Sequence, residues 1–318
     1  MSLEITPIKT TDLELNLTVT KKYNVSNEKE EFHKARNGKW SGTVVKDLMK
    51  CNRKGAKMSW HDPERIFEFS NSIISLIYEK SMQRKTGKHI ETKGTKEMQY
   101  GSRVEPLILA IGLEKIKSLD NNISIIEPVK FKSFPNYPNA GATSDSVAKN
   151  INSEVVATVE AKGCTNWGTH YKRTYERMSE KDIDFWQTQT QMISWDVDIC
   201  YYLVSEPPTD ILKYLYYDGD IMDLLEDFKE ECPVTVEVVR SSPFHQKAIM
   251  QRIIFVENIL NKWLTEGGRI DDIFYKECNV ILDEEPEIIK EPEIIKSSNN
   301  LPKDLPNSII DLPEDLPF

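Results

Sequence analysis

Charged side chains stand in a stretch that otherwise has the pattern of two apolar strands joined by a polar turn. The stretch is GATSDSVAKNINSEVVATVEAKG, residues 141–163, and the charges of interest are Asp145, Glu160 and Lys162. Because residues two apart on a strand share a face, Glu160 and Lys162 are expected to project together. A buried sheet would avoid such charges unless they had a chemical role.

Carboxylates on neighbouring strands can converge on a hard cation. Asp145 and Glu160 offer the oxygen ligands that Mg²⁺ prefers. Lys162 can position or help to deprotonate a water molecule, and its charge opposes the negative charge of a phosphorane-like transition state. The pattern therefore indicates a metal-dependent nuclease, with an exposed hairpin carrying an ordinary salt bridge as the alternative.

Two further segments offer groups of the same kind. Glu105 stands in GSRVEPLILAIG, an otherwise apolar helical pattern, where a lone acid can also be a cap or an ion-pair partner. Gln187 and Gln191 in DFWQTQTQMISW are four residues apart and share a helix face. Their amides could orient a water molecule or a phosphate, although a solvated polar face would have the same spacing.

The periodicity of apolar residues predicts the elements that would position these groups. Helices are expected at residues 43–52, 62–84, 97–117, 180–194 and 244–265. Strands are expected in ISIIEPVKF, in the stretch near Asp145, and in EVVATVEAK, DICYYLVS and VTVEVVR, with a turn at NINS. The predicted fold class is α/β (α+β), with a central mixed sheet flanked by helices.

Four blocks of sequence resemble the lambda exonuclease (YqaJ-type viral recombinase) branch of the PD-(D/E)xK nuclease superfamily. They are HKARNGKWSGT, GSRVE, ATSDS with VEAKG, and FWQTQTQM, they occur in the family's order, and they span about residues 30–205. The resemblance implies a restriction-endonuclease-like core. It also implies that Glu105, Asp145 and Glu160 hold one or two Mg²⁺ ions, for which Mn²⁺ can substitute.

The resemblance assigns further roles to single residues. Lys162 would serve the attacking water, and Gln187 would complete the site. Arg36, Thr43 and Thr143 would form a pocket for a terminal 5′-phosphate, which suits the N–H fork of an arginine and the donors of hydroxyl groups.

The family's activity is implied in the same way. Its members digest one strand of duplex DNA from a 5′ end and leave a 3′ single strand for an annealing protein, and the best-known member forms a ring-shaped trimer. The alternatives are a non-catalytic DNA-end-binding or adaptor protein and a Cas4-like or helicase-associated nuclease. The latter holds an iron–sulfur cluster through four cysteines, whereas the five cysteines here are scattered.

Charge and composition are compatible with a DNA partner. The formal net charge of the 318 residues is -10, but residues 283–318 carry ten acids and three lysines, so the remainder is nearly balanced. Basic clusters occur in KDLMKCNRKGAK and QRKTGKH. No apolar run is long enough for a membrane span, and there is no secretion signal or cysteine framework. We expect a protein of the bacterial or phage-infected host cytoplasm, without membrane partners.

The domain organisation is predicted from shifts in composition. Residues 1–25 alternate as a β extension, residues 26–281 form the nuclease domain, and residues 282–318 form a disordered acidic, proline-rich tail with EPEIIK repeated. The last residues, Asp315, Leu316, Pro317 and Phe318, resemble the tip of bacterial single-strand-binding proteins. The tail could dock on a repair or recombination protein, only solubilise the chain, or mimic DNA and restrain the enzyme.

Overall fold

The computed structural model describes residues 25–283 except for residues 89–93, 177 and 181. The extension predicted for residues 1–25 and the tail predicted for residues 282–318 lie almost wholly outside the described residues. The fold belongs to a unit that ends at Cys278. In the described part of the chain, no helix combines the length and the apolar character that crossing a membrane requires.

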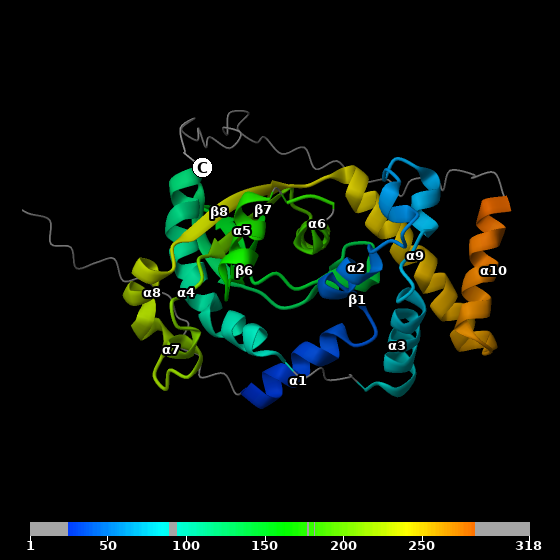
Figure 1. The fold of residues 1–318 in the computed structure, drawn as a ribbon, viewed down its shortest axis with the longest axis horizontal. Coiled ribbons are helices and arrows are strands. Elements are labelled where there is room, and N and C mark those ends of the chain that lie inside the picture. Colours follow the sequence, from blue (N-terminus) through cyan, green and yellow to red (C-terminus); the bar gives the residue numbers. More distant parts are fainter. Residues whose placement is uncertain (1–24, 89–93, 177, 181, 284–318) are drawn as a thin grey trace, which may run out of the picture. The chain divides into compact units, whose positions relative to one another are not determined.

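A five-stranded sheet forms the centre of this unit (Figure 1). Its order is β2 (Ile123–Pro128), β5 (Ser146–Asn150), β6 (Val155–Gly163), β7 (Ile199–Ser205) and β8 (Val234–Arg240). Strands β6 and β7 run parallel, and all other neighbours are antiparallel. The predicted mixed sheet is therefore confirmed, as is the turn that joins β5 to β6.

A smaller sheet joins parts of the chain that are far apart in sequence. Strand β4 (Tyr137–Ala142) pairs with β3 (Lys132–Phe134) in antiparallel and with β1 (Trp40–Ser41) in parallel orientation. The β1 pairing sets Ser41 beside Gly141. It therefore brings the segment that starts at Arg36 to the chain just before Asp145.

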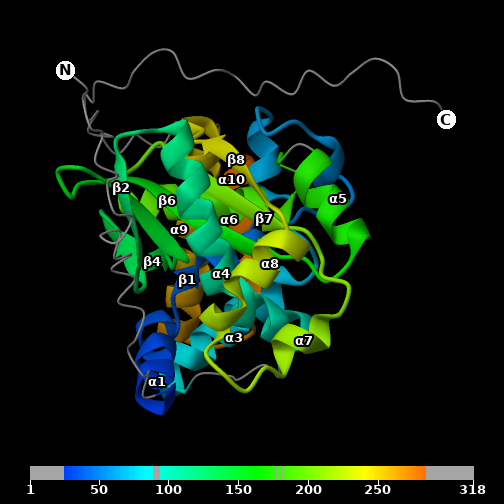
Figure 2. The ribbon, with the colours of Figure 1, turned by 90° about the vertical axis from the view of Figure 1, so that its left-hand side faces the viewer.

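Helices cover both faces of the central sheet. Helix α4 (Lys96–Leu119) packs on the face that carries Val159 and Leu203, and Figure 2 shows it crossing in front of the strands. On the opposite face, Met192 of α6 (Ile183–Trp195) packs with Tyr202. Since side chains alternate along a strand, residues of even number on β6 face α6.

Two glycines allow α4 to lie close to the strands. A side chain on Gly112 would collide with Leu203 of β7. At Gly163, which follows Lys162, an added Cβ would lie 2.9 Å from Val104 Cγ2. A larger residue at either position would force a packed side chain of the facing element to shift. The helix that carries Glu105 is thereby set against the strand that carries Glu160.

The other helices surround these layers. They are α1 (Val25–Arg36), α2 (Gly42–Leu48), α3 (Ile73–Thr86), α5 (Trp167–Tyr175), α7 (Ile211–Leu215), α8 (Leu225–Glu231), α9 (Pro243–Glu266) and α10 (Ile270–Asp283).

The single helix predicted for residues 62–84 is wrong. Residues Pro63–Phe67 form a 3-10 helix, and α3 begins only at Ile73. The residues between these two helices pair with another part of the chain, because Cys51 forms an antiparallel β-bridge with Phe69 and the Asn52 N–H donates to the carbonyl of Glu68 at 3.2 Å. This extended pairing interrupts the helical pattern before α3 begins.

Candidate active site

The end of β6 holds a buried carboxylate and an ammonium group side by side. Glu160 is 2% exposed, and Lys162 Nζ donates to its Oε1. The same ammonium lies 3.4 Å from Gln187 Oε1. The two charged side chains share a face of the strand, and that face is turned toward α6.

Two amides on consecutive turns of α6 hold the Glu160 carboxylate. Gln187 Nε2 donates to Glu160 Oε1 at 2.6 Å, and Gln191 Nε2 donates to Oε2. Gln191 also donates to the backbone carbonyl of Thr143 at 3.1 Å. The shared face of these glutamines is therefore buried against the cluster, whereas the alternative was a solvated polar face. In the structure the amides orient a carboxylate, and the expected contact to water or phosphate stays a prediction.

Asp145 joins the cluster from the link between β4 and β5. The β5–β6 register sets Ser146 opposite Val159, which brings Asp145 level with the end of β6. Its Oδ2 accepts a hydrogen bond from the backbone N–H of Ala161 at 2.7 Å. That bond fixes the carboxylate between Glu160 and Lys162 along the strand.

Glu105 approaches from α4 and has no hydrogen bond or ion pair among the described residues. Burial raises its pKa to about 7, the charge of Glu160 adds to the shift, and Lys162 opposes it. Burial also raises the pKa of Asp145 well above its usual value, and Glu160 and Glu105 contribute to that shift. Three carboxyl groups thus share one lysine, so their full ionisation would leave an excess of negative charge.

Lys162 is held as an ammonium ion. Burial alone would lower its pKa, but the charges of Glu160, Asp184 and Asp145 outweigh burial and raise it. Asp184 Oδ1 lies 3.9 Å from Lys162 Nζ. The lysine can therefore donate hydrogen bonds and supply positive charge, and it holds its proton at neutral pH.

Asp184 is a site residue that sequence reasoning missed. Its Oδ2 accepts from Tyr202 OH at 2.6 Å and lies 3.2 Å from Arg173 Nε. Burial opposes its ionisation, but Lys162 and Arg173 lower its pKa overall. In the sequence it is only an acid in the first turn of a helix, so nothing local distinguishes it.

The carboxylate oxygens suit a hard cation, although the described side chains do not form a complete metal site. Within the described ranges, no three acidic, histidine or cysteine side chains are drawn together closely enough to hold a metal ion. Both oxygens of Glu160 already accept hydrogen bonds from nitrogen donors. Asp145 uses one oxygen for Ala161, and the described residues give Glu105 no hydrogen bond or ion pair. Oxygen ligands with excess negative charge match what Mg²⁺ requires.

Arg36 and Thr43 meet at a second corner of the fold. Arg36 Nη2 donates to Thr43 Oγ1 at 2.6 Å and to Ser41 Oγ at 3.2 Å. Burial lowers the pKa of Arg36, and among the described side chains no carboxylate pairs with it. Thr143 lies on the neighbouring β4–β5 link, where its buried hydroxyl finds no partner among the described residues. The corner therefore offers a guanidinium and hydroxyl groups that an anion could use.

A buried carboxylate anchors the segment that carries this corner. Glu257 of α9 accepts from Trp40 Nε1 at 2.7 Å, from Asn139 Nδ2 at 2.7 Å and from both Nη atoms of Arg84. Arg84 Nε in turn donates to the carbonyl of Gly38 at 2.8 Å. One acid thus fastens β1, β4 and α3 to α9.

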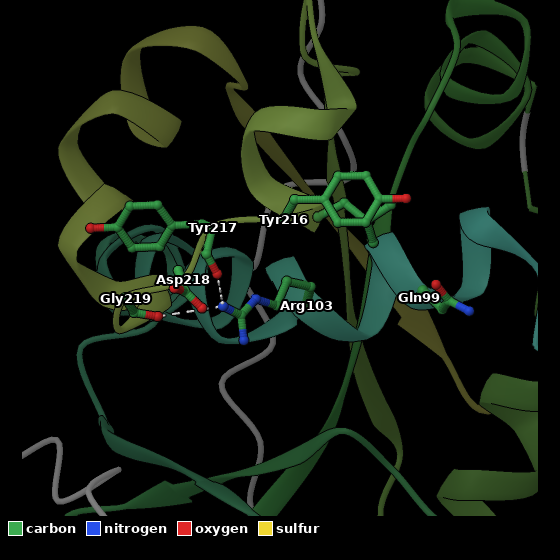
Figure 3. A pocket seen from close by; sticks show the side chains of 7 residues that line it. Gln99, Arg103, Tyr216, Tyr217, Asp218 and Gly219 are labelled. Atoms are coloured by element: carbon green, nitrogen blue, oxygen red, sulfur yellow. Dashed lines mark hydrogen bonds between the residues drawn. The ribbon is translucent and has the colours of Figure 1, made fainter.

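A surface hollow of about 600 Å³ opens on another part of α4 (Figure 3). Gln99 and Arg103 line it together with the chain from Leu215 to Gly219. Arg103 Nη2 donates to the carbonyl of Tyr217 at 2.5 Å, which ties this loop to the helix. None of the predicted site residues lines the hollow.

Comparisons with known proteins support the fold. No match was found among protein-family models or among curated proteins. An alkaline exonuclease, LHK-Exo from Laribacter hongkongensis, superposes with a TM-score of 0.50 at 20% identity, covering 79% of this chain and 99% of the other. A phage-related exonuclease from Haemophilus somnus 129PT gives a TM-score of 0.50 at 15% identity, covering 72% and 96%. The chain has the fold of these exonucleases.

Proposed function

We propose that this protein is a Mg²⁺-dependent exonuclease that digests double-stranded DNA from its 5′ ends. The observation that carries the proposal is the set of charged groups at the end of β6, where Lys162 contacts Glu160, and where Glu105 and Asp145 interact electrostatically with both. The shared fold with two exonucleases supports the class of reaction. Hydrolysis of a phosphodiester needs a site that accepts a highly charged substrate, and an acidic cluster can do so only with cations.

The roles follow from the geometry of the side chains. Glu105, Asp145 and Glu160 would hold the metal, and Gln187 and Gln191 would keep the Glu160 carboxylate in place. A bound Mg²⁺ supplies Lewis acidity toward the scissile phosphate and the attacking water. Lys162, as an ammonium ion, donates a hydrogen bond to the attacking water and stabilises the charge that grows on the phosphate oxygens.

The direction of digestion would come from the corner of Arg36 and Thr43. A guanidinium with hydroxyl partners, and with no carboxylate partner among the described residues, is suited to a terminal 5′-phosphate, and Thr143 offers a further hydroxyl group. The product would be a 3′ single strand for an annealing protein in phage-type recombination. By the same family resemblance, we propose a homotrimer.

The decisive experiment is digestion of linear duplex DNA. Wild-type protein should release nucleotides with Mg²⁺ and release none with EDTA, and 5′-phosphorylated ends should be preferred over 5′-hydroxyl ends. Lys162→Ala should lower the rate at least a hundredfold, which is the usual effect of losing a donor that stabilises transition-state charge.

Lys149→Ala is the matched control for this experiment. Lys149 lies on β5 of the same sheet and pairs with Glu127 at the surface, so its loss should leave the rate unchanged. Absence of Mg²⁺-dependent digestion by the wild type would overturn the enzyme proposal in favour of a DNA-end-binding protein. Equal rates for Lys162→Ala and wild type would remove the lysine from its role.

A further inference from the structure

Three large aromatic side chains form an exposed row on α5. Trp167, Tyr171 and Tyr175 are 62%, 58% and 62% exposed, and they recur every four residues on one face of the helix. The rings of Tyr171 and Tyr175 lie 5.5 Å apart at an angle of 33°. Single exposed apolar side chains are common, whereas a continuous aromatic row marks a surface that binds something.

A buried histidine packs against two of the rings in this row. The ring of the buried His170 meets Trp167 edge-on at 5.5 Å and Tyr175 at 6.3 Å. At the start of the helix, Asn166 caps the backbone N–H of Thr169 at 2.9 Å. Two of the three rings are therefore held by packing before any ligand arrives, which lowers the entropy lost on binding.

The row belongs to the surroundings of the proposed active site. Trp167 is five residues beyond Lys162, so a fully extended chain could separate them by at most about 17 Å. Helix α5 packs against β7 and lies at the margin of the fold in Figure 2. Its Arg173 binds Asp184, which in turn lies 3.9 Å from Lys162 Nζ. The path from Lys162 to the start of the aromatic row is therefore no longer than about five stacked nucleotides of one strand at 3.4 Å each.

The chemistry of the row favours an unpaired nucleic-acid strand. Flat rings on one helix face can stack with bases whose faces are open, as in a single strand, whereas a duplex hides those faces. The exposed Lys172 stands between Tyr171 and Tyr175 in the sequence and enters no ion pair within the described residues, so it can meet a phosphate.

We propose that Trp167, Tyr171 and Tyr175 form a stacking surface that binds single-stranded DNA beside the active site. The proposal rests on the proposed function, because the site itself supplies the reason for a strand to be unpaired there. The surface would keep the strand ordered for several nucleotides around the reacting phosphate.

The test measures binding without catalysis. Wild-type full-length protein in EDTA is titrated against a fluorescein-labelled thymidine 20-mer and against an abasic strand of the same length, with fluorescence anisotropy as the readout. Trp167→Ala/Tyr171→Ala should weaken binding of the 20-mer by about tenfold or more, since stacking contributes substantially for each base. The affinity of this variant for the abasic strand should equal that of the wild type, because that strand has phosphates and no bases.

Two control variants accompany this pair. Trp167→Phe/Tyr171→Phe keeps the rings and should bind the 20-mer as the wild type does. Tyr275→Ala removes a ring that is also 62% exposed, on α10, and should leave binding unchanged. Thermal melting of each variant establishes that it is folded.

The outcomes separate this inference from the proposed function. Equal affinity of wild type and Trp167→Ala/Tyr171→Ala for the 20-mer overturns the stacking surface, even if duplex digestion is found. A change in molecular mass by light scattering, with unchanged affinity for DNA, also overturns it and assigns the row to contact between copies of the chain. Loss of base-dependent binding, together with a wild type that digests no DNA, supports the surface and overturns the exonuclease.

Discussion

At the scale of single residues, each charge at the end of β6 is controlled by named neighbours. Glu160 accepts hydrogen bonds from two amides and an ammonium group, and Asp145 accepts one from a backbone N–H. Glu105 makes no hydrogen bond among the described residues. Lys162 is placed between Glu160 and Asp184. The lysine keeps its proton because the carboxylates on both sides outweigh the effect of burial.

Asp184→Asn should lower stability in a pH-dependent manner. The folded pKa of Asp184 is lowered below 3.8, so its contribution is fully present above about pH 4 and is lost as the pH falls further. At pH 7 the variant should lose on the order of 3 kcal/mol of unfolding free energy, because the buried charges of Lys162 and Arg173 lose a partner.

Urea unfolding at pH 7 and at pH 3 checks this prediction. The difference between wild type and Asp184→Asn should be smaller at pH 3, because the carboxyl group of the unfolded chain takes up a proton below about pH 4 while the folded group has a lowered pKa. A difference that is the same at both pH values would contradict the assigned charge interaction.

At the scale of elements, α9 fixes segments that come together only in the folded chain. Its Glu257 binds β1, β4 and α3, and its Arg252 donates to the carbonyls of Leu48 and Arg65. The corner of Arg36 and Thr43 therefore depends on a helix that follows it by more than two hundred residues.

Glu257→Ala should destabilise the protein strongly. Removing the acid leaves the guanidinium of Arg84 without its carboxylate and two further donors without an acceptor, which should cost about 3 to 5 kcal/mol. The loss should appear in chemical unfolding. Glu266→Ala, at the exposed end of the same helix, is the matched control and should change the unfolding free energy by less than about 0.5 kcal/mol.

These contacts explain how far the sequence could be used for prediction. The side-chain period of a strand is local, so it placed Glu160 and Lys162 on one face, and the spacing of glutamines placed Gln187 and Gln191 together. The break of helix 62–84 coincides with the bridge between Cys51 and Phe69, and the role of Asp184 depends on Arg173 and Tyr202. No local pattern reports such partners, and Arg36 entered only through a family resemblance.

At the scale of the whole molecule, charge is distributed unevenly along the chain. The total is -10, and residues 283–318 contribute ten acids against three lysines. The remaining residues are nearly neutral and include the basic clusters near Lys54 and Lys85. A nearly neutral body with local basic patches is compatible with binding a DNA backbone.

Removal of residues 311–318 should leave digestion of naked DNA unchanged. Two of the roles expected for this segment, docking on a repair or recombination protein and solubilising the chain, are not needed by the isolated enzyme. Initial rates of the truncated and full-length proteins on linear duplex DNA should agree within about twofold, a spread well under 1 kcal/mol of activation free energy. A clearly faster truncated protein would instead mean that the tail restrains the enzyme by mimicking DNA.

The contact between Lys162 and Glu160 also sets up a competition. The ammonium group occupies an oxygen of Glu160, and any divalent cation that binds there must displace it or share that oxygen. On the proposed function, the lysine therefore weakens the binding of the ion with which it would act. In the proposed mechanism, a cation that binds Glu160 frees the lysine to face the substrate. The same competition lowers the affinity for the cation, so activity should rise with the concentration of free cation.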